Sequence, residues 1–196
     1  MSKPKSEYEK CLVKLLNRFP QADEQGKIEY VIADGLAASL YSRVKRDHWD
    51  IDVKPVSPGP YNRQSEIVLD NYMADIVEEG YSHVGLKVSD DFVAETAKSI
   101  PLRGVPKNRV IVEHPAIVLV TKLTDTPINK YPPRTKDLQD AENILNRYLT
   151  ETVLERQSWV PIINTALKGL PPESREMTQQ RLQETASKKK IKNLFR

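Results

Sequence analysis

The order of hydrophobic patterns along the chain constrains its fold more than any other feature. Short runs rich in β-branched residues occur in the first half, whereas apolar residues with helical spacing dominate from residue 135 onward. A two-residue alternation indicates a strand, and a three-to-four-residue spacing indicates a helix. We therefore predict an α/β fold with a sheet built early in the chain and a helical C-terminal part.

The individual elements follow from the same patterns. The predicted strands are residues 28–33, 50–53, 84–88 and 109–112, and the predicted helices are residues 6–18, 36–41, 66–79, 91–99, 135–148, 150–168 (interrupted near Pro161) and 174–186. Residues 115–123 fit either period, and Pro115 at a first-turn position favours a helix. Residues 57–60 predict a loop. We divide the chain into an α/β domain over residues 1–150 and a helical extension with a basic tail over residues 151–196.

Composition narrows the cellular setting and the partners. No apolar run approaches the ~18 residues that span a bilayer, so we expect no membrane segment and a cytoplasmic protein. The single cysteine, Cys11, lies among leucines of a predicted helix and is expected to be a buried thiol. The net charge of +3 hides five basic residues and no acid in residues 185–196, which leaves −2 on the rest. This tail is either a solvated terminus or a surface that attracts nucleic acid by releasing counterions.

The carboxylate pair Asp50-Ile51-Asp52 is the strongest candidate for a working centre. On a strand, the two aspartates project from one face with Cα atoms about 7 Å apart. Carboxylate oxygens in this arrangement can hold Mg²⁺ against the phosphates of a nucleotide. The alternative is an exposed strand with two ordinary surface acids.

A possible phosphate cradle precedes this pair. The predicted strand ends at Asp34-Gly35, and a short helix of small residues follows. Backbone N–H groups at a glycine turn that opens a helix bind phosphate well. A cradle followed by a metal-binding pair is the combination that nucleotidyl transfer needs.

Residues 31–53 resemble the first motif of the minimal nucleotidyltransferase superfamily, a glycine-containing turn, a small-residue helix and Asp-x-Asp on the next strand. The AbiEii-like nucleotidyltransferases, which include toxins of toxin–antitoxin pairs, are the most similar group. Residues 114–123 resemble their segment in which a lysine follows a hydrophobic helix, and residues 134–140 (Arg-Thr-Lys-Asp-Leu-Gln-Asp) resemble their motif that opens a helix. The resemblance implies a small mixed sheet of the nucleotidyltransferase type, flanked by helices.

The resemblance also implies roles for individual residues. Asp50 and Asp52 would bind Mg²⁺ and act in catalysis with Asp137. Gly35 would shape the phosphate turn, and Lys122 would neutralise a nucleotide phosphate. The simpler alternatives are a turn glycine at 35, a surface lysine at 122 and, at 137, an acid stabilised by the dipole of its helix.

The sequence departs from the family pattern at two places. Asp34 replaces the first glycine of the usual turn, which puts a negative charge where phosphate should lie. The third carboxylate that many active members carry on a neighbouring strand has only Glu113 and Asp90 as candidates.

The expected function is therefore Mg²⁺-dependent transfer of a nucleotide from an NTP to a hydroxyl of RNA or protein, with the basic tail holding an RNA such as tRNA. The resemblance adds a role as a toxin with a cognate antitoxin. The alternative is a nucleotidyltransferase fold without catalysis that binds nucleic acid or a partner protein.

Overall fold

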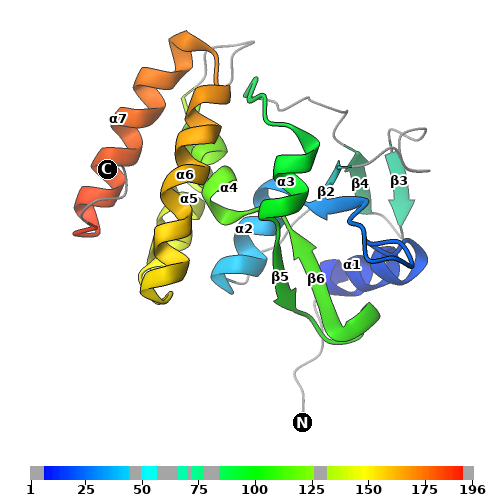
Figure 1. Ribbon diagram of the computed structural model, residues 1–196. Coiled ribbons are helices and arrows are strands. Elements are labelled where there is room, and N and C mark those ends of the chain that lie inside the picture. The colour runs from blue at the N-terminus through cyan, green and yellow to red at the C-terminus, as the bar shows by residue number, and fades with distance from the viewer. Residues whose placement is uncertain are drawn as a thin grey trace.

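The computed structural model describes residues 7–44, 50–56, 66–69, 72–76, 84–125 and 132–191. Its helices are α1 (Glu7–Arg18), α2 (Asp34–Ser42), α3 (Asp90–Thr96), α4 (Pro115–Leu123), α5 (Thr135–Tyr148), α6 (Val153–Gly169) and α7 (Pro172–Lys188), with a 3₁₀ turn, η2, at Pro106–Asn108. Its strands are β1 (Tyr30–Ile32), β2 (Asp50–Pro55), β3 (Glu66–Leu69), β4 (Tyr72–Ile76), β5 (Lys98–Pro101) and β6 (Arg109–Val112). Figure 1 shows their arrangement.

The strands form one mixed sheet in the order β3-β4-β2-β1-β6-β5. The β1 strand runs antiparallel to β2 and parallel to β6, and β4 runs parallel to β2. All three residues of β1 are buried, as expected for an interior strand covered on both faces. The fold is thus α/β with a mixed sheet, as the sequence predicted at that level of detail.

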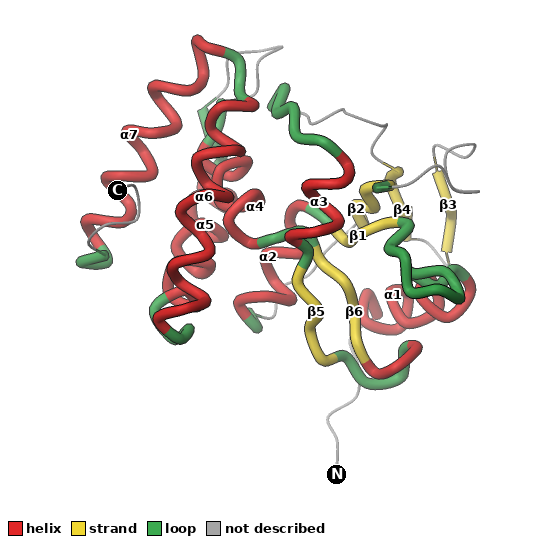
Figure 2. The backbone as a smooth tube through the Cα atoms, in the orientation of Figure 1, coloured by secondary structure: helices red, strands yellow, loops and turns green. Residues whose placement is uncertain are grey.

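The helices that follow the sheet pack around α4. Every residue of α4 is buried, and α2, α5, α6 and α7 all contact it. Figure 2 shows α4 to α7 gathered together to one side of the strands. A helix that is apolar on all sides must be enclosed in this way, because no face of it suits water. The α4 helix therefore anchors the C-terminal helices beside the sheet.

Local signals determine where several of these helices begin. Pro115 occupies the first turn of α4, and Nδ1 of His114 accepts the backbone N–H of Ala116 at 3.0 Å. The α6 helix begins with a capping box formed by Thr152 and Glu155. The predicted strand at Arg109–Val112 and the predicted helices at Pro115–Leu123 and Thr135–Tyr148 are confirmed. Cys11 is buried on α1, as expected.

Two predictions were wrong in type. The predicted helix over residues 66–79 is instead two antiparallel strands, β3 and β4. Of these, β4 also pairs with β2. The predicted strand over residues 84–88 is irregular, because its Lys87 N–H bonds the Gly169 carbonyl at the end of α6 and none of the described strands pairs with it. The predicted loop over residues 57–60 lies outside the described residues.

Two more predictions were wrong in extent. The helix predicted over residues 91–99 ends at Thr96, and β5 begins at Lys98. The α6 helix continues through Pro161, where an interruption was predicted. Pro161 is on the exposed side, whereas Trp159 and Ile163 are fully buried. Packing of these neighbours therefore offsets the backbone hydrogen bond that the proline removes.

Candidate functional site

Asp50 and Asp52 lie at the start of β2. Asp50 is exposed and Asp52 is half-buried, while Ile51 and Val53 are buried. The alternation of the strand therefore turns both carboxylates away from the apolar face that Ile51 and Val53 occupy. Because β2 is antiparallel to β1, the pair is next to the residues that follow the C-terminal end of β1.

The connection from β1 to α2 approaches this carboxylate pair directly. The Ala33 N–H donates to the Asp52 carbonyl at 2.9 Å, which places Asp34 beside β2. Asp34 has φ +48°, in the left-handed region that favours glycine. Gly35, the predicted turn glycine, is buried in the first turn of α2. The unusual backbone conformation of this turn is therefore at Asp34.

Lys122, in the last turn of α4, lies between two carboxylates. Its ammonium group forms ion pairs with Asp34 and with Asp137, the latter at 3.1 Å. Burial by itself would lower the pKa of Lys122, but attraction to Asp34 and Asp137 outweighs it, so the pKa is raised. Lys122 is therefore a charged, buried group, and the alternative of a surface lysine is wrong.

Asp137 is the third residue of α5, and it connects the site to the start of that helix. Its carboxylate accepts from the Arg134 guanidinium at 2.6 Å and from the Arg134 backbone N–H at 3.3 Å. Burial would raise the pKa of Asp137, but hydrogen bonds from Arg134 and Lys122 lower it to about 2. Asp137 is therefore both an N-terminal-turn acid and a partner of Lys122.

Several aspartates lie near the two cations of this site. Arg134 is close enough to Asp34 and Asp50 for both to raise its pKa, after the larger effect of Asp137. Lys122 and Arg134 are thus near the aspartates at positions 34, 50 and 137.

The carboxylate oxygens of Asp50 and Asp52 are of the ligand type that magnesium prefers. Within the described ranges, no group of three or more His, Cys, Asp and Glu side chains is placed to hold a metal ion. Mg²⁺ commonly takes one or two carboxylates from the protein and completes its shell with water and substrate phosphate oxygens. Asp50 and Asp52 fit that role, provided that the other ligands come from a bound nucleotide.

The two proposed third carboxylates, Glu113 and Asp90, come from different elements. Glu113 is buried in an ion pair with Lys54 at 3.0 Å, and Asp90 is in the first turn of α3. The register instead pairs Asp75 of β4 with Asp52 of β2. Sequence analysis missed Asp75 because residues 66–79 were predicted as a helix. The missed signal was Asp70-Asn71, two turn-forming residues between two short apolar runs.

The basic tail is described only in part. Lys189 forms an ion pair with Glu142 of α5 at 3.7 Å, and Lys188 and Lys190 are exposed. Lys192 and Arg196 lie outside the described residues. The described part of the tail therefore combines one lysine held against α5 with two that face solvent.

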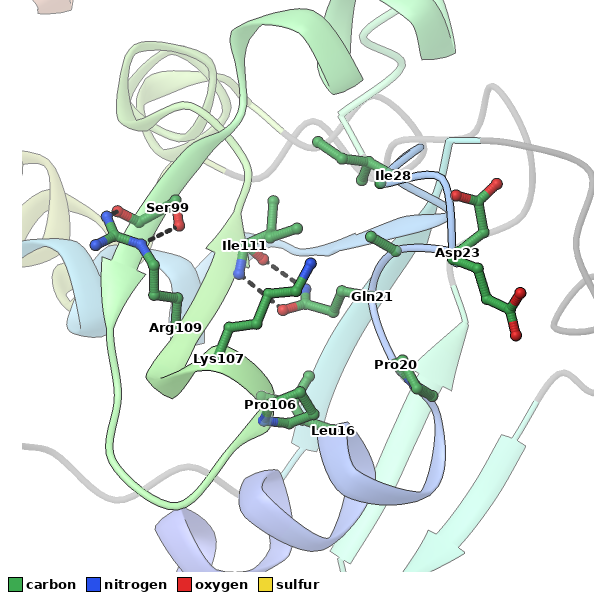
Figure 3. A pocket seen from close by; sticks show the side chains of 13 residues that line it. Leu16, Pro20, Gln21, Asp23, Ile28, Ser99, Pro106, Lys107, Arg109 and Ile111 are labelled. Carbon is green, nitrogen blue, oxygen red and sulfur yellow. Dashed lines mark hydrogen bonds between the residues drawn. The ribbon is translucent and has the colours of Figure 1, made fainter.

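A separate cavity of about 600 Å³ lies at the other end of the strands (Figure 3). Pro20, Lys107 and Arg109 are among its lining residues, and the Gln21 side chain exchanges hydrogen bonds with the backbone of Ile111 at 2.6 and 2.7 Å. The cavity is at the N-terminal ends of β1 and β6, whereas Asp34 follows the C-terminal end of β1. It is therefore distinct from the carboxylate–lysine site.

Fold and geometry together define an α/β protein with a carboxylate–lysine site at the C-terminal end of an interior strand. None of the described helices is long and apolar enough to cross a lipid bilayer. No known family model matches the chain, and no curated protein sequence matches it. The functional argument therefore depends on the site.

Proposed function

We propose that this chain is a Mg²⁺-dependent nucleotidyltransferase of the minimal, AbiEii-like type, which transfers a nucleotide from an NTP to a hydroxyl of RNA or protein. One observation carries the proposal. The Asp50–Asp52 pair of β2, Lys122 of α4, and Arg134 and Asp137 of α5 are distant in sequence, yet they converge beside the β1–α2 turn.

Each group has a distinct task in this reaction. Asp50 and Asp52 would hold the magnesium ion, which when bound supplies charge stabilisation to the phosphates. Lys122 and Arg134 supply positive charge beside the turn, where the triphosphate would bind. Asp137 keeps both cations oriented. The acceptor hydroxyl oxygen bonds to the α-phosphorus and loses its proton to water. The bond from that phosphorus to the oxygen it shares with the β-phosphate breaks, and pyrophosphate leaves in line with that oxygen.

The decisive experiment combines calorimetry and a transfer assay on the wild type and on Asp50→Asn/Asp52→Asn. Each NTP is titrated with and without Mg²⁺, and transfer of labelled nucleotide to total RNA and protein is then measured. We expect metal-dependent binding and transfer in the wild type and loss of both in the double variant, with an unchanged melting temperature. Asp91→Asn, an exposed acid in α3, is the matched control and should behave as wild type.

The acceptor in this proposal is an RNA such as tRNA, held by the basic tail. Lys188 and Lys190 are its exposed described lysines. Replacing both with glutamate should weaken tRNA binding and flatten its salt dependence by about 1 to 2 units of slope. Equal affinity in the wild type and this variant over a salt series would place the RNA elsewhere.

The physiological role in this proposal is a toxin that a cognate antitoxin neutralises. Induced expression of the wild type should then arrest growth, whereas Asp50→Asn/Asp52→Asn should not. A protein encoded next to this chain that restores growth would identify the antitoxin. Growth that is unaffected by the wild type would favour a housekeeping transferase.

The ion pair between Asp34 and Lys122 supports a second function, because Asp34 takes the place beside Lys122 that a nucleotide phosphate would need. In this alternative, the fold binds RNA or a partner protein without catalysis. It predicts no metal-dependent NTP binding and RNA binding that is unchanged in Asp50→Asn/Asp52→Asn. The same calorimetric titrations therefore separate the two functions.

A further inference from the structure

Lys122 is enclosed far more completely than its partners. Its side chain is 3% exposed, compared with 10% for Asp137 and 21% for Asp34. Of the two acids that contact it, Asp34 is thus the more open to water.

The surroundings of the two carboxylates also differ. Asp137 accepts hydrogen bonds from both the side chain and the backbone of Arg134 in addition to Lys122. Asp34 is on a turn in which its own backbone has φ +48°. A left-handed conformation at a residue other than glycine is costly, although aspartate tolerates it better than most residues. Of the two contacts with Lys122, the one with Asp34 is therefore made by the more exposed side chain, from a left-handed backbone position.

We propose that Asp34 is an internal competitor for phosphate, whose carboxylate occupies the anion site at Lys122 and must leave before a nucleotide can bind. This inference rests on the proposed function for its choice of ligand. The competition itself needs only that a phosphate-type anion and the Asp34 carboxylate exclude each other at the Lys122 ammonium group.

This competition would keep the resting site closed to free phosphate anions. A triphosphate must displace a carboxylate that is already in place, and it is also repelled by that carboxylate once displaced. A divalent cation at Asp50 and Asp52 would relieve this repulsion, because it adds positive charge beside the turn. Nucleotide binding to the wild type should accordingly depend more steeply on Mg²⁺ than binding to a variant without the Asp34 charge.

The test measures pyrophosphate and Mg²⁺–ATP binding by calorimetry in the wild type, Asp34→Asn, and Asp34→Asn/Lys122→Gln. Asparagine keeps the size of the side chain and tolerates the left-handed backbone, so only the charge is removed. We expect Asp34→Asn to bind pyrophosphate about tenfold or more tightly than wild type, since a like charge a few ångströms away is lost. The added Lys122→Gln change should abolish that gain. Melting temperatures show whether each variant is folded.

Pyrophosphate separates this inference from the proposed function. Equal affinity in the wild type and Asp34→Asn would overturn the competition, whatever the transferase assay shows. A gain that persists in Asp34→Asn/Lys122→Gln would also overturn it, because the anion would then be bound elsewhere. Tighter pyrophosphate binding that requires Lys122, without nucleotide transfer by any variant, would support the competition and refute the proposed function. If the double variant does not fold, Asp34→Asn/Lys122→Arg replaces it and should retain most of the gain.

Discussion

Replacing Asp137 with asparagine removes one of the two carboxylates that hold Lys122 and the acid that fixes Arg134. Interactions with these cations lower the pKa of Asp137 from 3.8 to about 2. At ~1.4 kcal/mol per pKa unit, this difference corresponds to roughly 2 kcal/mol of folding free energy. The Arg134 side chain is 61% exposed, so screening reduces its share. We expect a cost of about 1 to 2 kcal/mol at neutral pH.

The pH dependence distinguishes this ion-pair contribution from simple loss of packing. Because the folded-state pKa is lowered, the stabilisation is fully present above the unfolded-state value and is lost as pH falls toward about 2. Urea unfolding of wild type and Asp137→Asn, measured from neutral pH to about pH 3, should show a free-energy difference that shrinks below about pH 4. Asp125→Asn, which removes an ion pair with Arg181, is a control away from the site. A difference that is constant over the whole pH range would refute the reasoning.

Three further predictions concern the packing around the site. Gly169→Ala should cost about 1 to 3 kcal/mol in thermal unfolding, because its added Cβ would lie 2.2 Å from the Lys87 carbonyl oxygen. Tyr41→Phe removes a hydrogen bond to the partly buried Glu151 and should cost about 1 to 2 kcal/mol by urea unfolding. Burial lowers the pKa of His114 to about 3, so the folded state loses stability as pH falls below about 6.5. His114→Asn keeps a side-chain acceptor for the start of α4 and should reduce that loss by up to about 2 kcal/mol at pH 5.

Prediction from sequence succeeded where local chemistry determines an element. Pro115 and the apolar run after it indicated α4 at its observed bounds, and α5 was predicted at Thr135–Tyr148. Prediction failed for residues 66–79 because short apolar runs fit both the helical and the strand period. Whether such a run forms a strand depends on an available partner strand. That failure also hid Asp75, whose place opposite Asp52 exists only once β4 pairs with β2.

For the candidate site, too, the sequence determined some features and the tertiary structure determined the others. The sequence by itself determined the Asp50–Asp52 pair and its alternation on a strand, because the two-residue period is a local property of extended backbone. It left open whether Lys122 was a surface group, because the exposure of a side chain depends on what packs around it. Only the tertiary structure decided that α4 is enclosed on all sides and that Lys122 lies between Asp34 and Asp137. A buried ammonium group needs carboxylates nearby to remain charged, and the chain brings them from two distant segments.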